Sequence, residues 1–253
     1  MKKILIASIF SGLFISFLFS QTGKQGMYIK RIEPNYYYQS SNDRYNNLNS
    51  KDDIEKLFFG DFNASVEFSF LPSNEGRRPP SGFRILKNSS NTSYMLEVKY
   101  ISNVEEAYKE ASKRHPSIGL SASEIYSLSD ARRIQIRDQN RIAFAKQHEE
   151  MLILYKIESM TFPVSNQFAE KIHKKMVSFI DNFKVNSIPV LLLDGYNVVF
   201  RNVVGNEVWS LNIHMPQDDA QKWAVFCLQI ITDAQANKLD VSKYILVLDT
   251  FKN

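Results

Sequence analysis

Residues 196–214, YNVVFRNVVGNEVWSLNIH, decide the fold. Two alternating apolar segments flank Gly205-Asn206, which is typical of a two-residue β-hairpin turn. Pairing Val204 with Glu207 sorts the remaining side chains onto two faces of the hairpin. One face carries Val198, Phe200, Asn202, Trp209, Leu211 and Ile213, and the other carries Asn197, Val199, Arg201, Ser210, Asn212 and His214. The sequence therefore predicts a hairpin with one apolar face and one polar face.

Three more strands are predicted upstream of the hairpin, over residues 65–70, 82–87 and 94–101. In each of them apolar side chains recur at every second position, as in Val66, Phe68 and Phe70. This period indicates strands that bury one face and expose the other to water. Because short polar turns separate the last two segments, we expect an antiparallel meander.

Helices are predicted between and after the strands. Their apolar spacing and capping residues place them over residues 103–114, 129–146 or beyond, 165–183 and from Pro216 to about 236. The expected fold class is α+β, with antiparallel hairpins packed against several amphipathic helices. The order hairpin then helix occurs twice, over 82–114 and 195–236. Two ββα-type units, related by duplication, are the alternative to a generic α+β order.

The N-terminus has the three-part layout of a secretory signal peptide. Lys2 and Lys3 precede an apolar run from Ile4 to Phe19, and Ser20 is a small residue at the expected cleavage point. The alternative is an uncleaved anchor, but the 16 apolar residues fall short of the roughly 20 that span a bilayer. The expected organisation is a signal peptide over 1–20, a polar, flexible leader over 21–60 and a globular region over 61–253, with 61–150 and 151–253 as its possible sub-units. Within the leader, a short helix is expected over residues 51–59.

Composition excludes several classes of function. Without Lys2 and Lys3, 29 of the 31 basic residues remain against 27 acidic ones, a net charge of +2. This balance does not favour a nucleic-acid or anionic-membrane partner, and no second apolar run approaches spanning length. Cys227, the single cysteine, permits neither an intrachain disulfide nor lipid attachment after the apolar run. No cofactor is indicated, since the sequence lacks a glycine-rich phosphate loop.

Catalytic and metal-binding motifs are not apparent. The four histidines, at positions 115, 148, 173 and 214, have neither helical i, i+4 spacing nor a cysteine pair, so no metal site is predicted. Cys227 lies on the apolar stripe of its helix, which predicts a buried and unreactive thiol. The residues considered for acid–base catalysis are His214, Glu207, Asp194 and Asp218.

Two surfaces are considered for binding. The first is the polar hairpin face, where Arg201, His214, Asn197 and Asn212 are the ligand-binding candidates. The second is a basic ridge of Arg133, Arg137 and Arg141 at i, i+4 and i+8 on the long helix, which suits an anion or an acidic partner. For each surface the plain alternative is a solvated face of the element that carries it.

Together these features predict an exported, soluble protein of the periplasm or the cell exterior. Export, the absence of a catalytic motif and the tyrosine-rich segments favour a non-catalytic binding module whose partner is another envelope or extracellular protein. Whether the chain is an enzyme stays open at this point. The alternative is an envelope hydrolase that uses dispersed carboxylates together with His214.

Overall fold

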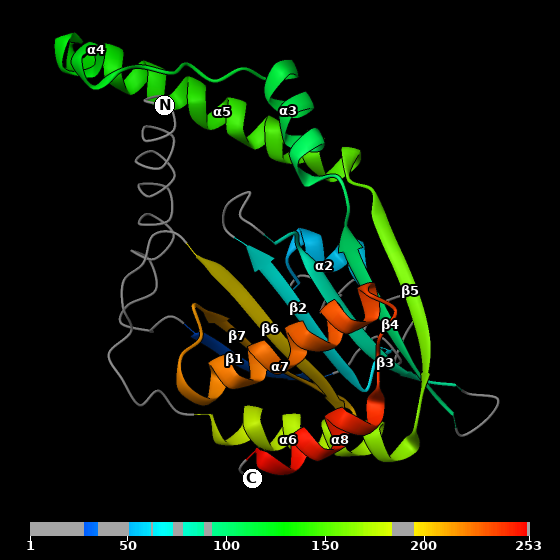
Figure 1. The fold of residues 1–253 in the computed structure, drawn as a ribbon. Helices are drawn as coiled ribbons and strands as arrows, with labels where there is room; N and C mark the ends of the chain where they lie inside the picture. Colours follow the sequence, from blue (N-terminus) through cyan, green and yellow to red (C-terminus); the bar gives the residue numbers. More distant parts are fainter. Residues whose placement is uncertain are drawn as a thin grey trace. The chain divides into compact units, whose positions relative to one another are not determined.

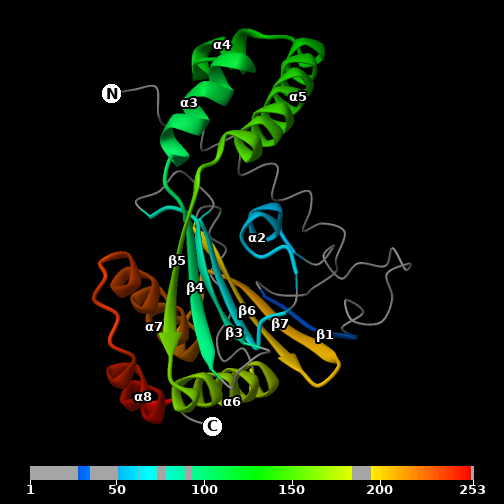
Figure 2. The ribbon, with the colours of Figure 1, turned by 90° about the vertical axis from the view of Figure 1, so that its right-hand side faces the viewer.

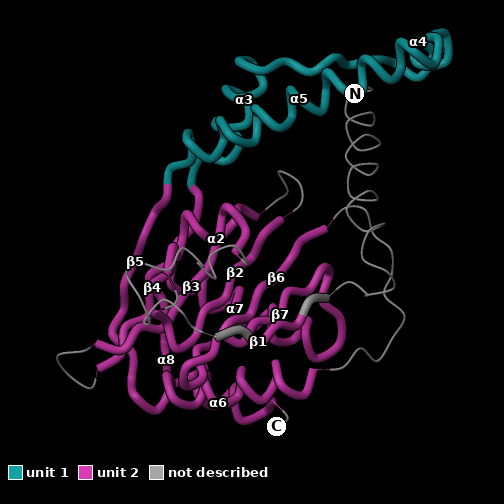
Figure 3. Tube along the Cα trace, turned by 180° about the vertical axis from the view of Figure 1, so that it is seen from behind, with its two compact units in different colours: residues 1–25, 102–156 teal, residues 26–101, 157–253 magenta. Residues whose placement is uncertain are grey.

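The computed structural model describes residues 28–34, 51–61, 63–72, 78–88, 93–183 and 195–251. The chain divides into two compact units, each continuous in space (Figure 3). Residues 102–156 belong to the first unit, and the described residues of 26–101 and 157–253 form the second. The predicted leader lies largely outside these ranges, as do the predicted signal peptide and Asp194.

The second unit is built on one seven-stranded antiparallel sheet (Figure 1). Its strand order is β1-β7-β6-β2-β3-β4-β5. The strands are β1 (Tyr28–Pro34), β2 (Val66–Pro72), β3 (Ser81–Lys87), β4 (Tyr94–Ile101), β5 (Ile157–Val164), β6 (Tyr196–Val204) and β7 (Glu207–His214). With the helices packed beside this sheet, the predicted α+β class is confirmed.

The hairpin of β6 and β7 has the predicted register. Val204 pairs with Glu207, Phe200 with Leu211 and Asn197 with His214. The turn works because Gly205 takes a positive φ of 59°, a left-handed conformation that costs glycine little. The two-residue turn thus fixes which side chains enter the core.

The apolar face of the sheet packs against α6 (Asn166–Asn182), α7 (Asp218–Gln235) and α8 (Val241–Thr250). Figure 2 shows α7 and α8 on one side of the sheet and α2 (Asp53–Phe58) on the other. Alternate residues of the central strands, such as Phe68, Phe83 and Phe200, are fully buried in this core. Aromatic rings continue from the sheet into the helices, since Phe179 contacts both Phe200 and Trp223.

Two segments inside the range predicted as a flexible leader are ordered elements. Residues 28–34 form β1, which pairs along its length with β7, and residues 53–58 form α2. An Asp52–Glu55 capping box begins α2, satisfying backbone groups at both ends of the motif. The flexible-leader prediction therefore fails at β1, whereas α2 lies within the range 51–59 where a short helix is expected. Alternation in β1 is obscured because Lys30, Arg31 and Glu33 are charged, as is common on edge strands.

The opposite edge strand, β5, was not predicted. Its sequence contains Pro163, which has no backbone N–H to donate, and a proline argues against predicting a strand. At an edge that donor has no strand to meet, so the proline is tolerated there. The helix before it ends at Leu154, and β5 begins at Ile157.

The first unit is a helical insertion between β4 and β5. It contains α3 (Val104–Arg114), α4 (Ala122–Ser127) and α5 (Asp130–Leu154). Its two ends are tied together, because the Ser102 amide donates to the Lys156 carbonyl at 3.0 Å and Asn103 Nδ2 donates to the Leu154 carbonyl at 3.0 Å. The side chain of Asn103 is engaged in this closure and makes no side-chain cap on α3.

The boundaries of the two compact units differ from those of the predicted sub-units, 61–150 and 151–253. They also do not divide the chain into two equivalent ββα units. The division falls after Ile101 and after Lys156. In the first hairpin–helix segment the helix, α3, belongs to the insertion. In the second, α7 contributes Trp223 and Ile230 to the core on the sheet.

Buried amides shape the inside of the insertion. Asn140 is 6% exposed; its Oδ1 accepts from the Ile118 amide at 2.7 Å and its Nδ2 donates to the Ile118 carbonyl at 2.9 Å. Gln147 donates to the carbonyl of His115. Ala107 and Ala111, both small, are buried on α3 and allow α5 to approach. In the part of the chain that the structure describes, no helix combines the length and apolarity needed to cross a bilayer.

Candidate functional site

Arg201, a predicted ligand-binding residue, lies in a buried network of four charges. We call Lys51, Glu55, Glu67 and Arg201 the buried charge network. Arg201 Nη1 lies 2.9 Å from Glu55 Oε1 and also bonds Glu67 Oε1, and Lys51 Nζ lies 2.9 Å from Glu67 Oε2. All four residues are at most 3% exposed. Arg201 therefore contacts the segment that carries α2 and is shielded from solvent.

The network is balanced in charge and rich in hydrogen bonds. Lys51 Nζ also donates to the Phe59 and Asp61 carbonyls, at 2.6 and 2.7 Å. Burial lowers the pKa of Lys51, against the opposing attraction of Glu67. For Arg201, burial disfavours the charge, but the attraction of Glu55 and Glu67 outweighs it and raises the pKa. Both cations thus remain paired inside the protein, where an uncompensated charge is very costly.

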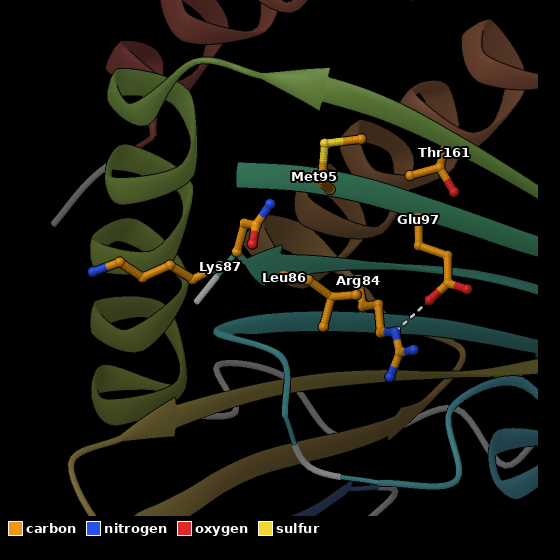
Figure 4. A pocket seen from close by; sticks show the side chains of 7 residues that line it. Arg84, Leu86, Lys87, Met95, Glu97 and Thr161 are labelled. Atoms are coloured by element: carbon orange, nitrogen blue, oxygen red, sulfur yellow. Dashed lines mark hydrogen bonds and ion pairs between the residues drawn. The ribbon is translucent and has the colours of Figure 1, made fainter. Parts of the chain in front are cut away.

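A second charged group borders a shallow pocket on the same face of the sheet (Figure 4). Arg84 Nη1 lies 2.9 Å from Asp61 Oδ1, and Arg84 Nε donates to Glu97. The pocket has a volume of about 380 Å³ and is lined by Arg84, Leu86, Lys87, Asn88, Met95, Glu97 and Thr161. Since Arg84 and Glu97 are paired with each other, as the dashed line in Figure 4 marks, the pocket offers a small apolar floor beside neutralised charges.

The remaining predicted ligand-binding residues lie at the far end of the hairpin. His214 and Asn197 are paired across β6 and β7, and His214 Nδ1 lies 3.3 Å from Asn197 Oδ1. Asn212 pairs with Val199 and is half-buried. Arg201 lies four residues along β6 from Asn197 and belongs to the buried charge network. The predicted polar cluster is thus divided into an enclosed part and a half-exposed part.

Two of the residues considered for hydrolysis, Glu207 and His214, lie far apart. Glu207 and His214 occupy opposite ends of β7, roughly 23 Å apart at about 3.3 Å per residue. The Glu207 carboxylate accepts from Trp209 Nε1 at 2.8 Å. Asp218 begins α7 and is exposed, and Asp194 lies outside the described residues. Glu207 and His214 therefore lie beyond hydrogen-bonding reach of a common substrate atom.

The surroundings of Cys227, His173 and His115 are those of residues that support the fold. Cys227 is fully buried in the core, and burial raises the pKa of its thiol well above the ordinary value. His173 Nε2 lies 3.0 Å from the Val203 carbonyl, and His115 lies beside Glu150. Within the described ranges, no group of three histidine, cysteine or carboxylate side chains is arranged to hold a metal ion.

The predicted basic ridge lies on α5, where all three arginines are exposed. Arg133 pairs with Asp130 on the preceding turn, and no ion pair is recorded for Arg137 or Arg141 within the described residues. Large apolar side chains accompany them on the same helix. Ile134 is 50% exposed, Ile142 is 54% exposed and Phe144 is 42% exposed.

Exposed apolar groups recur through the whole insertion. In residues 102–156 they are Tyr108, Ile118, Tyr126, Ile134, Ile142, Phe144 and Ile153. Sequence reasoning identified the arginines and missed these neighbours, because α5 has apolar residues around most of its circumference and so no single stripe stands out. The helix buries Ile136 on one side and leaves Ile134 and Ile142 in water on another.

Comparison with known proteins adds no relative to this description. No protein-family model, no curated protein and no solved structure matches the chain.

Proposed function

We propose that this protein is a non-catalytic interaction module of the periplasm or cell exterior, and that its helical insertion is the element that contacts the partner. One observation carries the proposal: residues 102–156 expose seven large apolar side chains. Single exposed apolar residues are common, but a concentration of them on one small unit is typical of protein contact surfaces. The adjacent arginines agree with this reading, because arginine and aromatic residues are enriched at interfaces.

Export is the second part of the proposal and rests on residues 1–20 of the sequence. Expression of the full chain in a bacterial host, followed by fractionation and N-terminal sequencing, tests it. We expect a mature chain that begins at Gln21 in the periplasm or the medium. Recovery of a chain that still begins at Met1 in the cytoplasm would contradict export.

Site-specific photo-cross-linking of the full chain in its native cells tests the contact surface. A benzophenone amino acid replaces Ile142 in one strain and Val225 of α7 in another. The two positions form a matched pair, since they are 54% and 57% exposed. We expect a discrete cross-linked species from position 142 and none from position 225.

A second arm separates a specific contact from a chance collision. With the photo-reactive residue at Tyr126, which is 84% exposed, Ile134 and Ile142 are both changed to Gln. The cross-link should be lost while circular dichroism and the unfolding midpoint stay unchanged. Equal cross-linking from positions 142 and 225, or none from the insertion, would overturn the proposal.

A further inference from the structure

The side chains exposed on α5 indicate which chemical groups a partner of this helix would present. Two neighbouring rows run along the exposed part of this helix. Arg133, Arg137 and Arg141 form the first row, at intervals of four residues, and Phe144 extends it at i+3 from Arg141. A second row carries Ile134, Asp138 and Ile142. A ligand on α5 therefore meets basic and apolar groups side by side.

Basic residues outnumber acidic ones over the first 17 residues of α5, whereas Glu149 and Glu150 lie nearer its C-terminal end. Residues 130–146 contain five basic residues, Arg132, Arg133, Arg137, Arg141 and Lys146, and two acidic ones, Asp130 and Asp138. Asp130 is already paired with Arg133, and Arg132 donates to Gln135. No carboxylate partner is recorded for Arg137, Arg141 or Lys146 in the part of the chain that the structure describes. These cations are available to an acidic ligand.

We propose that the partner presents an acidic amphipathic protein segment to α5. Its carboxylates pair with Arg137 and Arg141, and its apolar side chains cover Ile134, Ile142 and Phe144. Arginine binds carboxylates through two parallel N–H donors, which gives such a contact orientation as well as attraction. This inference rests on the proposed function and specifies the partner of the same surface.

Other occupants fit the observations less well. A membrane surface would place Asp138, which lies between Ile134 and Ile142, against the apolar layer, where a carboxylate is costly. A second copy of the chain is the occupant that the sedimentation experiment below would identify. A phosphate polymer would use the arginines and leave the isoleucines uncovered. A protein segment with both acidic and apolar groups can pair with the arginines and cover the isoleucines at the same time.

Fluorescence anisotropy with synthetic peptides tests the inference on the full mature chain. The probe is a labelled amphipathic helix of Leu, Ala and Glu, about 20 residues long so that it is helical when bound. Its counterpart replaces every Glu by Lys. We expect the acidic peptide to bind about tenfold more tightly than the basic one, and the difference to shrink as salt increases.

Charge reversal gives the decisive arm. The variant Arg137→Glu/Arg141→Glu should reverse the preference, so that the basic peptide binds more tightly. Lys113→Glu/Lys174→Glu is the matched control, because it changes the net charge equally at exposed positions of α3 and α6. The control should keep the preference for the acidic peptide. Ile134→Gln/Ile142→Gln should weaken the binding of the acidic peptide, but the acidic peptide should still bind more tightly than the basic one.

Several results would overturn the inference. They are equal binding of both peptides, a control that loses the preference as fully as the α5 variant, or binding to vesicles of anionic phospholipid that depends on Arg137 and Arg141. Self-association in sedimentation that is lost in Ile134→Gln/Ile142→Gln would assign the surface to a second copy. If cross-links form at position 142 but the peptides do not discriminate, the acidic partner is rejected while the interaction module stands.

Discussion

Arg201 Nη1 lies 2.9 Å from Glu55 Oε1, although the two residues are 146 positions apart in the chain. This contact joins the short helix α2 to the middle of the sheet through an ion pair that is shielded from solvent. Residues 51–60, predicted to be the end of a leader, are therefore an integral part of the folded sheet unit. The stability of that unit depends on the arginine.

Replacing Arg201 by Met should lower the free energy of unfolding by about 3–5 kcal/mol, because Glu55 and Glu67 lose a cation while they remain buried. Urea denaturation measures this change. Arg137→Met, the same substitution at an exposed position, should stay within about 0.5 kcal/mol of the wild type. Adding Glu55→Leu to Arg201→Met should recover part of the loss, since the pair of Lys51 and Glu67 remains neutral. A loss below about 1 kcal/mol in the single variant would contradict this account.

Asn202 occupies a site where an apolar residue should be more stable. It is fully buried on the apolar face, and neither amide atom has a hydrogen-bond partner among the described residues. Leaving such a group unsatisfied costs about 1–3 kcal/mol, so Asn202→Leu should raise the free energy of unfolding by an amount of that order. Asn197→Leu is the control, since Asn197 contacts His214 and is half-buried. If Asn202→Leu destabilises the protein, the amide has a partner in solution.

Gly82 is required by a close approach between the sheet and the segment that covers it. A Cβ at this position would lie 2.7 Å from the Phe68 carbonyl oxygen and 2.9 Å from the Phe59 ring. Gly82→Ala should therefore destabilise the protein by about 1–3 kcal/mol in thermal or chemical unfolding. Gly119→Ala, where no atom lies within 4 Å, should be neutral or stabilising by up to about 1 kcal/mol. Equal effects of the two substitutions would contradict the packing argument.

Asp61 should contribute to stability in a pH-dependent way. Burial works to raise the pKa of this carboxyl, but the Asn63 amide and Arg84 outweigh it and hold the pKa below the ordinary value of 3.8. Between the folded pKa and 3.8 the unfolded chain binds more protons, so this contribution is present above pH 3.8 and is lost as the pH falls through the folded value. When unfolding is measured from pH 6 to about 2.5, the free energy of unfolding should fall less for Asp61→Asn than for the wild type. Parallel curves would refute the role of Asp61.

The sequence predicts those features that local rules determine. The register of β6 and β7 follows from a two-residue turn, and α6 lies within the range 165–183 that its apolar spacing predicts. Edge strands escape these rules: β1 mixes charged and apolar residues, and β5 contains Pro163. These two segments become strands because β1 pairs with β7 and β5 pairs with β4.

The candidate sites show the same division. The arginine row on α5 is visible from its spacing, because residues four apart share a helix face. The burial of Arg201 is not visible, since its partners Glu55 and Glu67 lie far away in sequence and meet it only when the sheet forms. Neither can spacing alone tell that Ile136 is buried while Ile134 is exposed on the same helix.

The closure of the helical insertion has a consequence for the sheet. Ser102 and Lys156 are hydrogen-bonded neighbours, and Ile101 is paired with Ile157 directly beside them. A short turn can therefore replace everything between them while β4 and β5 keep their alignment. The geometry of this closure therefore permits helices of other lengths between the same two strands, without a change in the alignment of the sheet.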